Sequence, residues 1–249
     1  MILTSKNNPL IKETASLKDK KGRKTLGRFL VEGRKMANEC LLSGLNVEYA
    51  FVAESYTGEL AMEERKIVRV SDDVLKYLSD EKTPQGVVCR VEIPRLEPQK
   101  PSGRCLLLDG VADPGNMGAI IRTANAAGYK KIYLTNDCTD PYSPKSVRAS
   151  MSGVFFTEIY VGERAELLKL FNGVSLLVAD MNGENLFKAV VPENYVLTIG
   201  NEANGVSELV KKAATKRLRI PMQATQESLN AAVSAGIAMY VLAREEFND

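Results

Sequence analysis

Short apolar runs alternate with helix-like segments along residues 105–249, and this alternation constrains the fold more than any other feature of the chain. The apolar runs, which we expect to form strands, are residues 105–109, 131–135, 174–179, 195–200 and 217–220. Helical periodicity lies between them at 117–127, 163–171 and 207–214, and a thin, apolar last helix is expected at 228–244. Strands that alternate with helices form a parallel sheet covered by helices, so the sequence predicts an α/β fold with a parallel sheet.

The N-terminal part predicts a smaller α/β module. Strands are expected at 48–52, 67–70 and 86–91, a helix at 74–78, and a strand that enters a helix across 28–42. Pro94, Pro98 and Pro101 then fall in a polar stretch that can continue neither a helix nor a central strand. We therefore expect an N-terminal domain at 1–95, a linker at 96–104 and a C-terminal domain at 105–249.

Basic residues are concentrated at the start of the chain. Residues 1–35 contain ten Lys or Arg and three acidic residues, although the whole chain has a net charge of +2. The first 35 residues therefore carry a charge of +7 and the remainder −5. This asymmetry is typical of a segment that binds the phosphates of a nucleic acid, and a solvated basic helix face would produce it equally well.

The chain contains no histidine, which excludes Ser-His-Asp and Cys-His nucleophilic catalysis. Its four cysteines are widely separated and form no CxxC pair, so we expect buried, reduced thiols and no metal site. The first ten residues lack an apolar signal core, and no stretch reaches the roughly 20 apolar residues of a membrane helix. A cytoplasmic protein is expected.

The loop that follows the first strand of the C-terminal domain is rich in glycine and opens a helix, which is where open α/β sheets bind ligands. Residues 109–122 match neither the GxGxxG pattern of a dinucleotide site nor the GxxxxGK[ST] pattern of a P-loop, so nicotinamide enzymes and nucleoside triphosphatases are disfavoured. If Asn116 is the N-cap of the helix, its side chain can turn into the crevice beside Arg122. Alternatively, Asn116 only caps the helix and Arg122 is a surface residue.

Two later turns have the same organisation. Residues 198–207 and 220–230 each include the end of an apolar strand and continue into small and polar residues. Irregular backbone has N–H and C=O groups to offer, so the two turns predict the wall of a small-ligand site.

Together, the three segments resemble in order and spacing the three motifs of the SpoU (TrmH) family of the SPOUT class of methyltransferases, over residues 105–245. Residues 29–34 and 83–87 are similar to the family's N-terminal substrate-binding domain. The resemblance implies a parallel sheet with a C-terminal deep trefoil knot, a small N-terminal α/β RNA-binding domain, and a homodimer formed through the knotted domain. The last helix would then contact a second subunit as well as its own sheet.

The activity that the resemblance implies is transfer of a methyl group from S-adenosylmethionine to a ribose 2′-hydroxyl of RNA. Ribosomal RNA, and 23S rRNA in particular, is the favoured substrate. Transfer RNA is the alternative substrate, and a non-catalytic RNA-binding protein of the same fold is the alternative function.

The resemblance also implies roles for individual residues. Those expected to hold the donor are Thr198, Gly200, Ile220, Met222, Ser228 and Leu229, and the catalytic candidates are Asn116, Arg122, Glu202 and Asn230. The family proposal makes Arg122 the general base, but a guanidinium keeps its proton to a pKa above about 12. We therefore expect Arg122 to bind the adjacent phosphate and stabilise the developing alkoxide, while Asn116 orients Arg122 or the ribose.

Two further features concern the loop after the second strand and the turns of the second and third motifs. Lys145, Ser146 and Arg148 are either RNA phosphate contacts or an ordinary helix start after a proline. Ala203 and Ala224 stand where the second and third motifs often have glycine, so the local backbone of these turns is expected to differ wherever a positive φ would be required.

Overall fold

The computed structural model describes residues 2–247, and the chain divides into two compact units. Residues 2–95 and 140–155 form the first unit, and residues 96–139 and 156–247 form the second. The predicted C-terminal domain is thus interrupted by a segment that packs with the N-terminal residues. Across residues 2–247, no helix combines the length and the apolarity needed to cross a bilayer.

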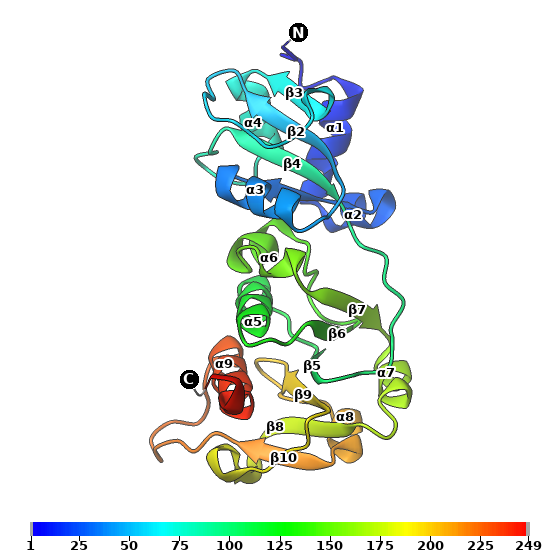
Figure 1. The fold of residues 1–249 in the computed structure, drawn as a ribbon, viewed down its shortest axis with the longest axis vertical. Coiled ribbons are helices and arrows are strands. Elements are labelled where there is room, and N and C mark those ends of the chain that lie inside the picture. Colours follow the sequence, from blue (N-terminus) through cyan, green and yellow to red (C-terminus); the bar gives the residue numbers. More distant parts are fainter. Residues whose placement is uncertain (1, 248–249) are drawn as a thin grey trace. The chain divides into compact units, whose positions relative to one another are not determined.

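The first unit is a four-stranded mixed sheet with helices (Figure 1). Its strands are β1 (Arg28–Glu32), β2 (Val47–Ala53), β3 (Ile67–Val70) and β4 (Val87–Glu92). Its helices are α1 (Pro9–Ala15), α2 (Lys20–Leu26), α3 (Arg34–Leu42), α4 (Asp72–Leu78) and α6 (Pro144–Ala149), with short 3-10 turns at Ser16–Lys18, Glu64–Lys66 and Gly153–Phe155. The strand order is β1-β4-β2-β3, in which β4 runs antiparallel to β1 and β2, whereas β2 and β3 are parallel.

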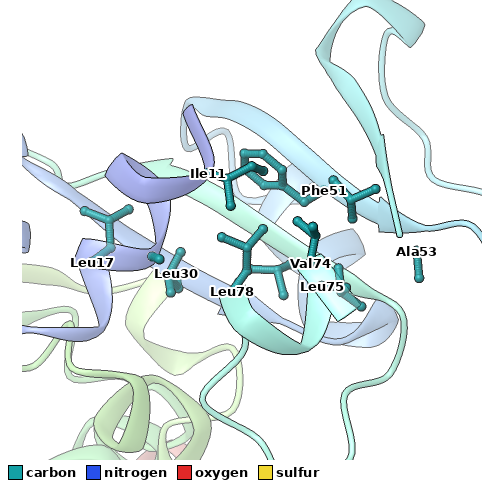
Figure 2. Packing of buried hydrophobic residues seen from close by; sticks show 11 residues of the cluster. Ile11, Leu17, Leu30, Phe51, Ala53, Val74, Leu75 and Leu78 are labelled. Carbon is teal, nitrogen blue, oxygen red and sulfur yellow. The ribbon is translucent and has the colours of Figure 1, made fainter. Parts of the chain in front are cut away.

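The core of the first unit lies between its sheet and helices α1 and α4 (Figure 2). Ile11 of α1, Phe51 of β2 and Leu78 of α4 are completely buried in this cluster. Val74 and Leu78 are four residues apart and therefore lie on the same face of α4, which is the face turned to the sheet.

Charge pairs and aromatic contacts hold residues 140–155 in the first unit. Arg23 Nε lies 2.7 Å from Asp140 Oδ2, and the Arg23 side chain is only 5% exposed. The ring of Tyr142 lies 5.0 Å from the ring of Phe29. This segment is therefore an integral part of the unit, although it follows a strand of the other unit in the sequence.

The second unit contains a six-stranded sheet in which every neighbouring pair is parallel. Its strands are β5 (Arg104–Asp109), β6 (Lys131–Thr135), β7 (Glu158–Gly162), β8 (Ser175–Asn185), β9 (Tyr195–Gly200) and β10 (Lys216–Arg219). The order β10-β8-β9-β5-β6-β7 reverses between β9 and β5. Open α/β sheets bind ligands at the carboxyl ends of the strands beside such a reversal.

Helices cover both faces of this sheet (Figure 1). They are α5 (Pro114–Ala126), α7 (Arg164–Leu170), α8 (Glu208–Ala213) and α9 (Ala231–Leu242), with 3-10 turns at Leu186–Lys188 and Arg244–Phe247. On one face, Leu167 of α7 and Val210 of α8 pack into a core with Leu107 and Val178 of the strands. On the other face, α5 and α9 pack against each other and α9 also contacts β9.

The predicted parallel α/β sheet is confirmed, and two of its strands, 131–135 and 195–200, have the predicted bounds. Strand β7 was not predicted, and β8 extends six residues beyond the predicted end. The last helix begins at Ala231 and not at 228, because Asn230 is its N-cap and accepts hydrogen bonds from Ala232 N and Val233 N at 2.8 and 3.3 Å. Residues 228–230 are thereby left outside the helix.

Candidate active site

Three turns meet at the carboxyl edge of the parallel sheet of the second unit. Residues 110–113 connect β5 to α5, residues 201–207 connect β9 to α8, and residues 220–230 connect β10 to α9. Because β5 and β9 are neighbours in the sheet, the first two turns begin side by side.

Hydrogen bonds join the first two turns along their length. Asp109 Oδ2 accepts from Ser207 N at 2.7 Å, and Asn201 Nδ2 donates to Gly110 O at 2.8 Å. Further out, Ala112 N and Asp113 N donate to the Glu202 carboxylate at 3.1 and 3.2 Å. The backbone that precedes α5 is therefore fixed relative to the turn after β9.

Three of the four predicted catalytic residues form one hydrogen-bonded path. Asn116 Nδ2 donates to Glu202 Oε1 at 2.9 Å, and Asn230 Nδ2 donates to Asn116 Oδ1 at 2.9 Å. Burial would raise the pKa of Glu202, but the hydrogen bonds from Asn116 and from three backbone N–H groups more than offset it, and this pKa lies below the ordinary value. An ionised carboxylate thus anchors all three turns.

Asn116 is not the N-cap of its helix, contrary to the prediction. Asp113 takes that position, since its Oδ1 accepts from Asn116 N at 2.8 Å, and Pro114 follows at the first helical residue. Aspartate followed by proline is a favourable helix start, because the carboxylate satisfies a free N–H and proline has none to satisfy. Asn116 is therefore inside the first turn, where Glu202 orients its amide.

Arg122, the fourth catalytic candidate, is exposed on α5. Six positions of an ideal helix turn through about 600°, so the side chains of Asn116 and Arg122 leave the axis about 120° apart. Within residues 2–247, the guanidinium of Arg122 forms no hydrogen bond or ion pair. It can therefore bind a phosphate or a developing alkoxide without first breaking another contact.

A cavity of about 480 Å³ opens beside the three turns. Five of the six predicted donor residues line it, together with Glu202 and Asn230; they are Gly200, Ile220, Met222, Ser228 and Leu229. Thr198 does not line the cavity, because it is completely buried inside β9. Mixed apolar and polar walls of this kind suit a nucleoside.

The turn after β9 is closed by backbone pairing. Asn201 N donates to Gly205 O at 3.0 Å, and Gly205 N donates to Asn201 O at 2.9 Å. Ala203 and Ala224, which replace glycines common in the family motifs, both have negative φ, since Met151 is the one non-glycine residue with a positive φ in the described part of the chain. Alanine is therefore compatible with both turns as they are folded.

The sequence interpretation missed one wall of the cavity. Ala179, Asp180 and Met181 line it from an irregular part of β8, where the register against β10 jumps between Arg217 and Leu218. The pattern carried a usable signal, because residues 179–183 break the apolar run with two polar residues and a glycine.

Arg164 was also missed. Its Nε lies 2.6 Å from Asp109 Oδ1 and its Nη2 lies 2.7 Å from Asp137 Oδ2. Burial would raise the pKa of Asp137, yet the hydrogen bonds from Thr135 and Arg164 hold it below its usual range. Arg164 thus neutralises the buried Asp109, the residue from which the first turn starts.

A larger cavity, of about 640 Å³, lies at the opposite end of the strands, near Arg104, Lys131 and Tyr195. It contains none of the predicted site residues. Within residues 2–247, no group of three His, Cys, Asp or Glu side chains could hold a metal ion. All four cysteines are buried, and burial raises the pKa of Cys40 to about 12.

The basic residues of the first 35 positions divide into two groups. Arg23 is buried against Asp140, Arg28 Nη2 lies 2.6 Å from Glu48 Oε1, and Lys18 Nζ donates to Tyr77 O at 2.6 Å, so these three have structural partners. Seven others are exposed: Lys6, Lys12, Lys20, Lys21, Lys24, Arg34 and Lys35. These seven can contact phosphates.

The proposed phosphate contacts after the second strand differ among themselves. Ser146 is completely buried and its Oγ donates to Asp140 O at 3.0 Å, so it cannot contact RNA. Arg148 Nη2 lies 2.7 Å from Asp80 Oδ2. Lys145 is exposed. The helix start after Pro144 is therefore the better interpretation for Ser146 and Arg148.

Comparison with known proteins gives two matches to families and several to whole proteins. Residues 103–240 match the SpoU rRNA Methylase family, and residues 8–89 match the MRM3-like substrate binding domain. The chain is 30% identical to an uncharacterized tRNA/rRNA methyltransferase of Synechocystis sp., over 98% of this chain and 94% of that protein. It is also 30% identical to the 23S rRNA (guanosine(2553)-2′-O)-methyltransferase RlmP of Bacillus subtilis, over 96% of this chain and 98% of RlmP.

Solved structures of the same architecture exist. The AdoMet-bound rRNA methyltransferase of Sinorhizobium meliloti superposes with a TM-score of 0.88 at 27% identity, and the match covers 100% of this chain and 99% of that one.

Proposed function

Because the chain belongs to the SpoU rRNA Methylase family, we propose that it transfers a methyl group from S-adenosylmethionine to a ribose 2′-hydroxyl of ribosomal RNA. The observation that carries the proposal is the path from Glu202 through Asn116 to Asn230, which joins three turns beside one cavity. The names of two relatives support the substrate and the donor, since RlmP is a 23S rRNA 2′-O-methyltransferase and the Sinorhizobium enzyme was solved with AdoMet. We take 23S rRNA as the favoured substrate.

The cavity beside the turns fits a sulfonium nucleoside. Ile220, Met222 and Leu229 offer apolar surface to a base, and Gly200 lets the turn after β9 fold closely against it, because a Cβ there would meet the Gly205 backbone. The Ser228 hydroxyl and the irregular backbone around it supply polar partners. When bound, S-adenosylmethionine supplies an electrophilic methyl group on a positively charged sulfur.

Arg122 and Asn116 act on the acceptor ribose. A ribose hydroxyl is a weak nucleophile, so its oxygen needs stabilisation as the proton leaves. Arg122 provides this stabilisation as a fixed cation that also binds the adjacent phosphate. The proton of the ribose hydroxyl passes to water or to a phosphate. The Asn116 amide uses one N–H for Glu202 and one lone pair for Asn230, which leaves one N–H and one lone pair for the ribose.

The first unit binds the RNA in this proposal. Its match to a substrate binding domain over residues 8–89 and the exposed lysines of α2 support that role. Phosphate contacts from such lysines position a nucleic acid without reading its sequence. We therefore assign residues 1–95, with which residues 140–155 pack, to substrate binding and the rest of residues 105–249 to methyl transfer, with 96–104 as the linker.

Two further properties of the family belong to the proposal. We propose that the C-terminal part of the parallel sheet is tied in a deep trefoil knot, in which the turn at 220–230 and helix α9 take part. We also propose a homodimer formed through this domain. The exposed apolar residues of α9 support the dimer, since Val233 and Tyr240 are 50% and 44% exposed.

One experiment separates this function from its alternatives. RNA from cells with and without the gene is mapped for 2′-O-methyl marks, and the purified protein is tested with radiolabelled S-adenosylmethionine on 23S rRNA and on transfer RNA. Loss of one mark in 23S rRNA supports the proposal. A lost mark in transfer RNA would establish the alternative substrate, and RNA binding without donor binding or transfer would establish a non-catalytic protein.

A further inference from the structure

We propose that Asp180 selects the charged donor, because its carboxylate favours S-adenosylmethionine over S-adenosylhomocysteine, the product whose sulfur is uncharged. The inference rests on the proposed function and extends it to a residue outside the three turns. It concerns how the site distinguishes a substrate from a product that differs by one methyl group and one charge.

A bulge in β8 brings Asp180 to the cavity. Val178 of β8 pairs with Arg217 of β10, but the next residue of β10, Leu218, pairs with Glu184. Residues 179–183 are therefore looped out of this pairing, and the first three of them line the cavity. Bulges redirect side chains in this way beside functional sites.

Glycine is required to close the bulge. A Cβ on Gly183 would lie 2.5 Å from the carbonyl carbon of Arg217, which is closer than a real Cβ atom approaches backbone. The bulge is thus a specific packed structure that holds Asp180 where it lines the cavity.

The two carboxylates of the cavity differ in their capacity to accept further contacts. Glu202 already accepts from Asn116 Nδ2, Ala112 N and Asp113 N. Asp180 Oδ1 accepts from Asn182 N at 2.8 Å, and Oδ2 forms an ion pair with Arg217 Nη1 at 3.8 Å, a separation too long for a hydrogen bond. Asp180 therefore has an oxygen available to a ligand.

The surroundings of Asp180 make its charge effective. Its side chain is 10% exposed, so water screens the carboxylate weakly. S-adenosylmethionine carries a sulfonium, an ammonium and a carboxylate, so its net charge is +1 by ordinary valence. S-adenosylhomocysteine keeps the ammonium and the carboxylate but has no sulfonium, so its net charge is zero. The side chain of Arg217, the ion-pair partner, is 47% exposed, so water screens its charge more strongly than that of Asp180. The carboxylate therefore lowers the free energy of the donor complex more than that of the product complex.

Isothermal titration calorimetry on the full chain tests this with three ligands. They are S-adenosylmethionine, S-adenosylhomocysteine and sinefungin, in which a protonated amine on carbon replaces the methylated sulfonium. The variant is Asp180→Asn, which keeps an acceptor for Asn182 N. The matched control is Glu184→Gln, which removes a negative charge from the same strand. Glu184 forms an ion pair with Lys216 at 3.0 Å and does not line the cavity.

We expect Asp180→Asn to weaken the binding of S-adenosylmethionine and of sinefungin by about tenfold, and the binding of S-adenosylhomocysteine by less than about twofold. Retained binding of the uncharged product shows in the same sample that the site is folded. Asp180→Glu, which keeps the charge, should retain the preference for the charged ligands, and Glu184→Gln should resemble the wild type.

Two results would overturn the inference. An equal loss of affinity for all three ligands in Asp180→Asn would mean that Asp180 contacts a group that the ligands share. Unchanged affinities would mean that the charge of Asp180 does not act on the ligand. A wild-type protein that binds none of the three would instead overturn the donor site, and with it the proposed function.

Discussion

Gly200 packs so closely against Gly205 that a Cβ on Gly200 would stand 2.2 Å from the carbonyl carbon of Gly205. The backbone pairing that closes the turn after β9 therefore needs glycine at 200. We expect Gly200→Ala to open the turn, with a loss of about 1–3 kcal/mol in the free energy of unfolding and at least tenfold weaker donor binding, where tenfold is about 1.4 kcal/mol.

Denaturant titration and calorimetry measure these two effects. Gly236→Ala is the control, because its Cβ would meet Thr123 Cγ2 at an ordinary 3.6 Å and alanine favours the helix by up to about 1 kcal/mol. Unchanged donor affinity in Gly200→Ala would contradict the role given to this turn.

Arg122→Ala should lower the rate of methyl transfer at least about a hundredfold, because a fixed cation at the developing alkoxide is lost. Folding and donor binding should be intact, since Arg122 is exposed and does not line the cavity. Single-turnover assays with radiolabelled donor measure the rate. Arg122→Lys keeps the positive charge but lacks the planar guanidinium, so it should recover part of the lost rate. Wild-type turnover in Arg122→Ala would remove this residue from the mechanism.

Glu202 should make the stability of the protein depend on acidity. Its pKa is lowered in the folded chain, so its contribution is present above the ordinary glutamate pKa of about 4.3 and is lost as the pH falls through the lower folded value. The difference in unfolding free energy between wild type and Glu202→Gln should therefore be largest near neutrality and shrink in acid. Denaturant titrations at a series of pH values measure it, and Glu208→Gln, which changes an exposed carboxylate of α8, is the control. A difference that stays constant across the series would be incompatible with the hydrogen bonds described.

Lys24→Ala should weaken RNA binding and leave stability unchanged, because this lysine is exposed on α2. A lost phosphate contact lowers the slope of log affinity against log salt concentration by about 1. Binding measured over a range of salt concentrations tests this. An unaltered slope would mean that Lys24 does not contact RNA.

Arg23→Ala, one position earlier, should instead lower the stability of the protein. Its guanidinium is buried, pairs with Asp140 and donates to the carbonyls of Leu17 and Lys18. Its removal leaves these acceptors without a donor, which should cost about 3 kcal/mol in the free energy of unfolding. Thermal or denaturant unfolding measures the loss, and equal stability of the Arg23 and Lys24 variants would refute the distinction drawn between them.

The sequence predicted the central strands of the parallel sheet most closely. β9 is buried along its whole length, and such continuous apolar runs are typical of central parallel strands. β7 was not predicted because its apolar run, residues 159–161, is only three residues long and is followed by Gly162. A run this short carries little of the periodic signal on which the prediction depends.

The candidate site was predictable where it coincides with turns, and less so where tertiary structure decides. Asn116, Glu202 and Asn230 were named through the resemblance to the three family motifs, each of which includes a strand end and the small and polar residues that follow it. The N-cap position of Asn116 was predicted wrongly, because Asp113 followed by proline is the stronger helix start. Asp180 was missed because residues 179–183 signal only an interruption of the strand, whereas the position of the bulge depends on the register between β8 and β10.

The insertion of residues 140–155 into the first unit bears on how such proteins can be recombined. If residues 1–95 were fused to another catalytic domain, Phe29 would lose its contact with Tyr142 and Arg23 its ion pair with Asp140. Both contacts are kept only if residues 140–155 of this chain are transferred as well. A functional chimera therefore needs two exchanged pieces, and evolutionary swaps at a single crossover near the prolines would yield a truncated core.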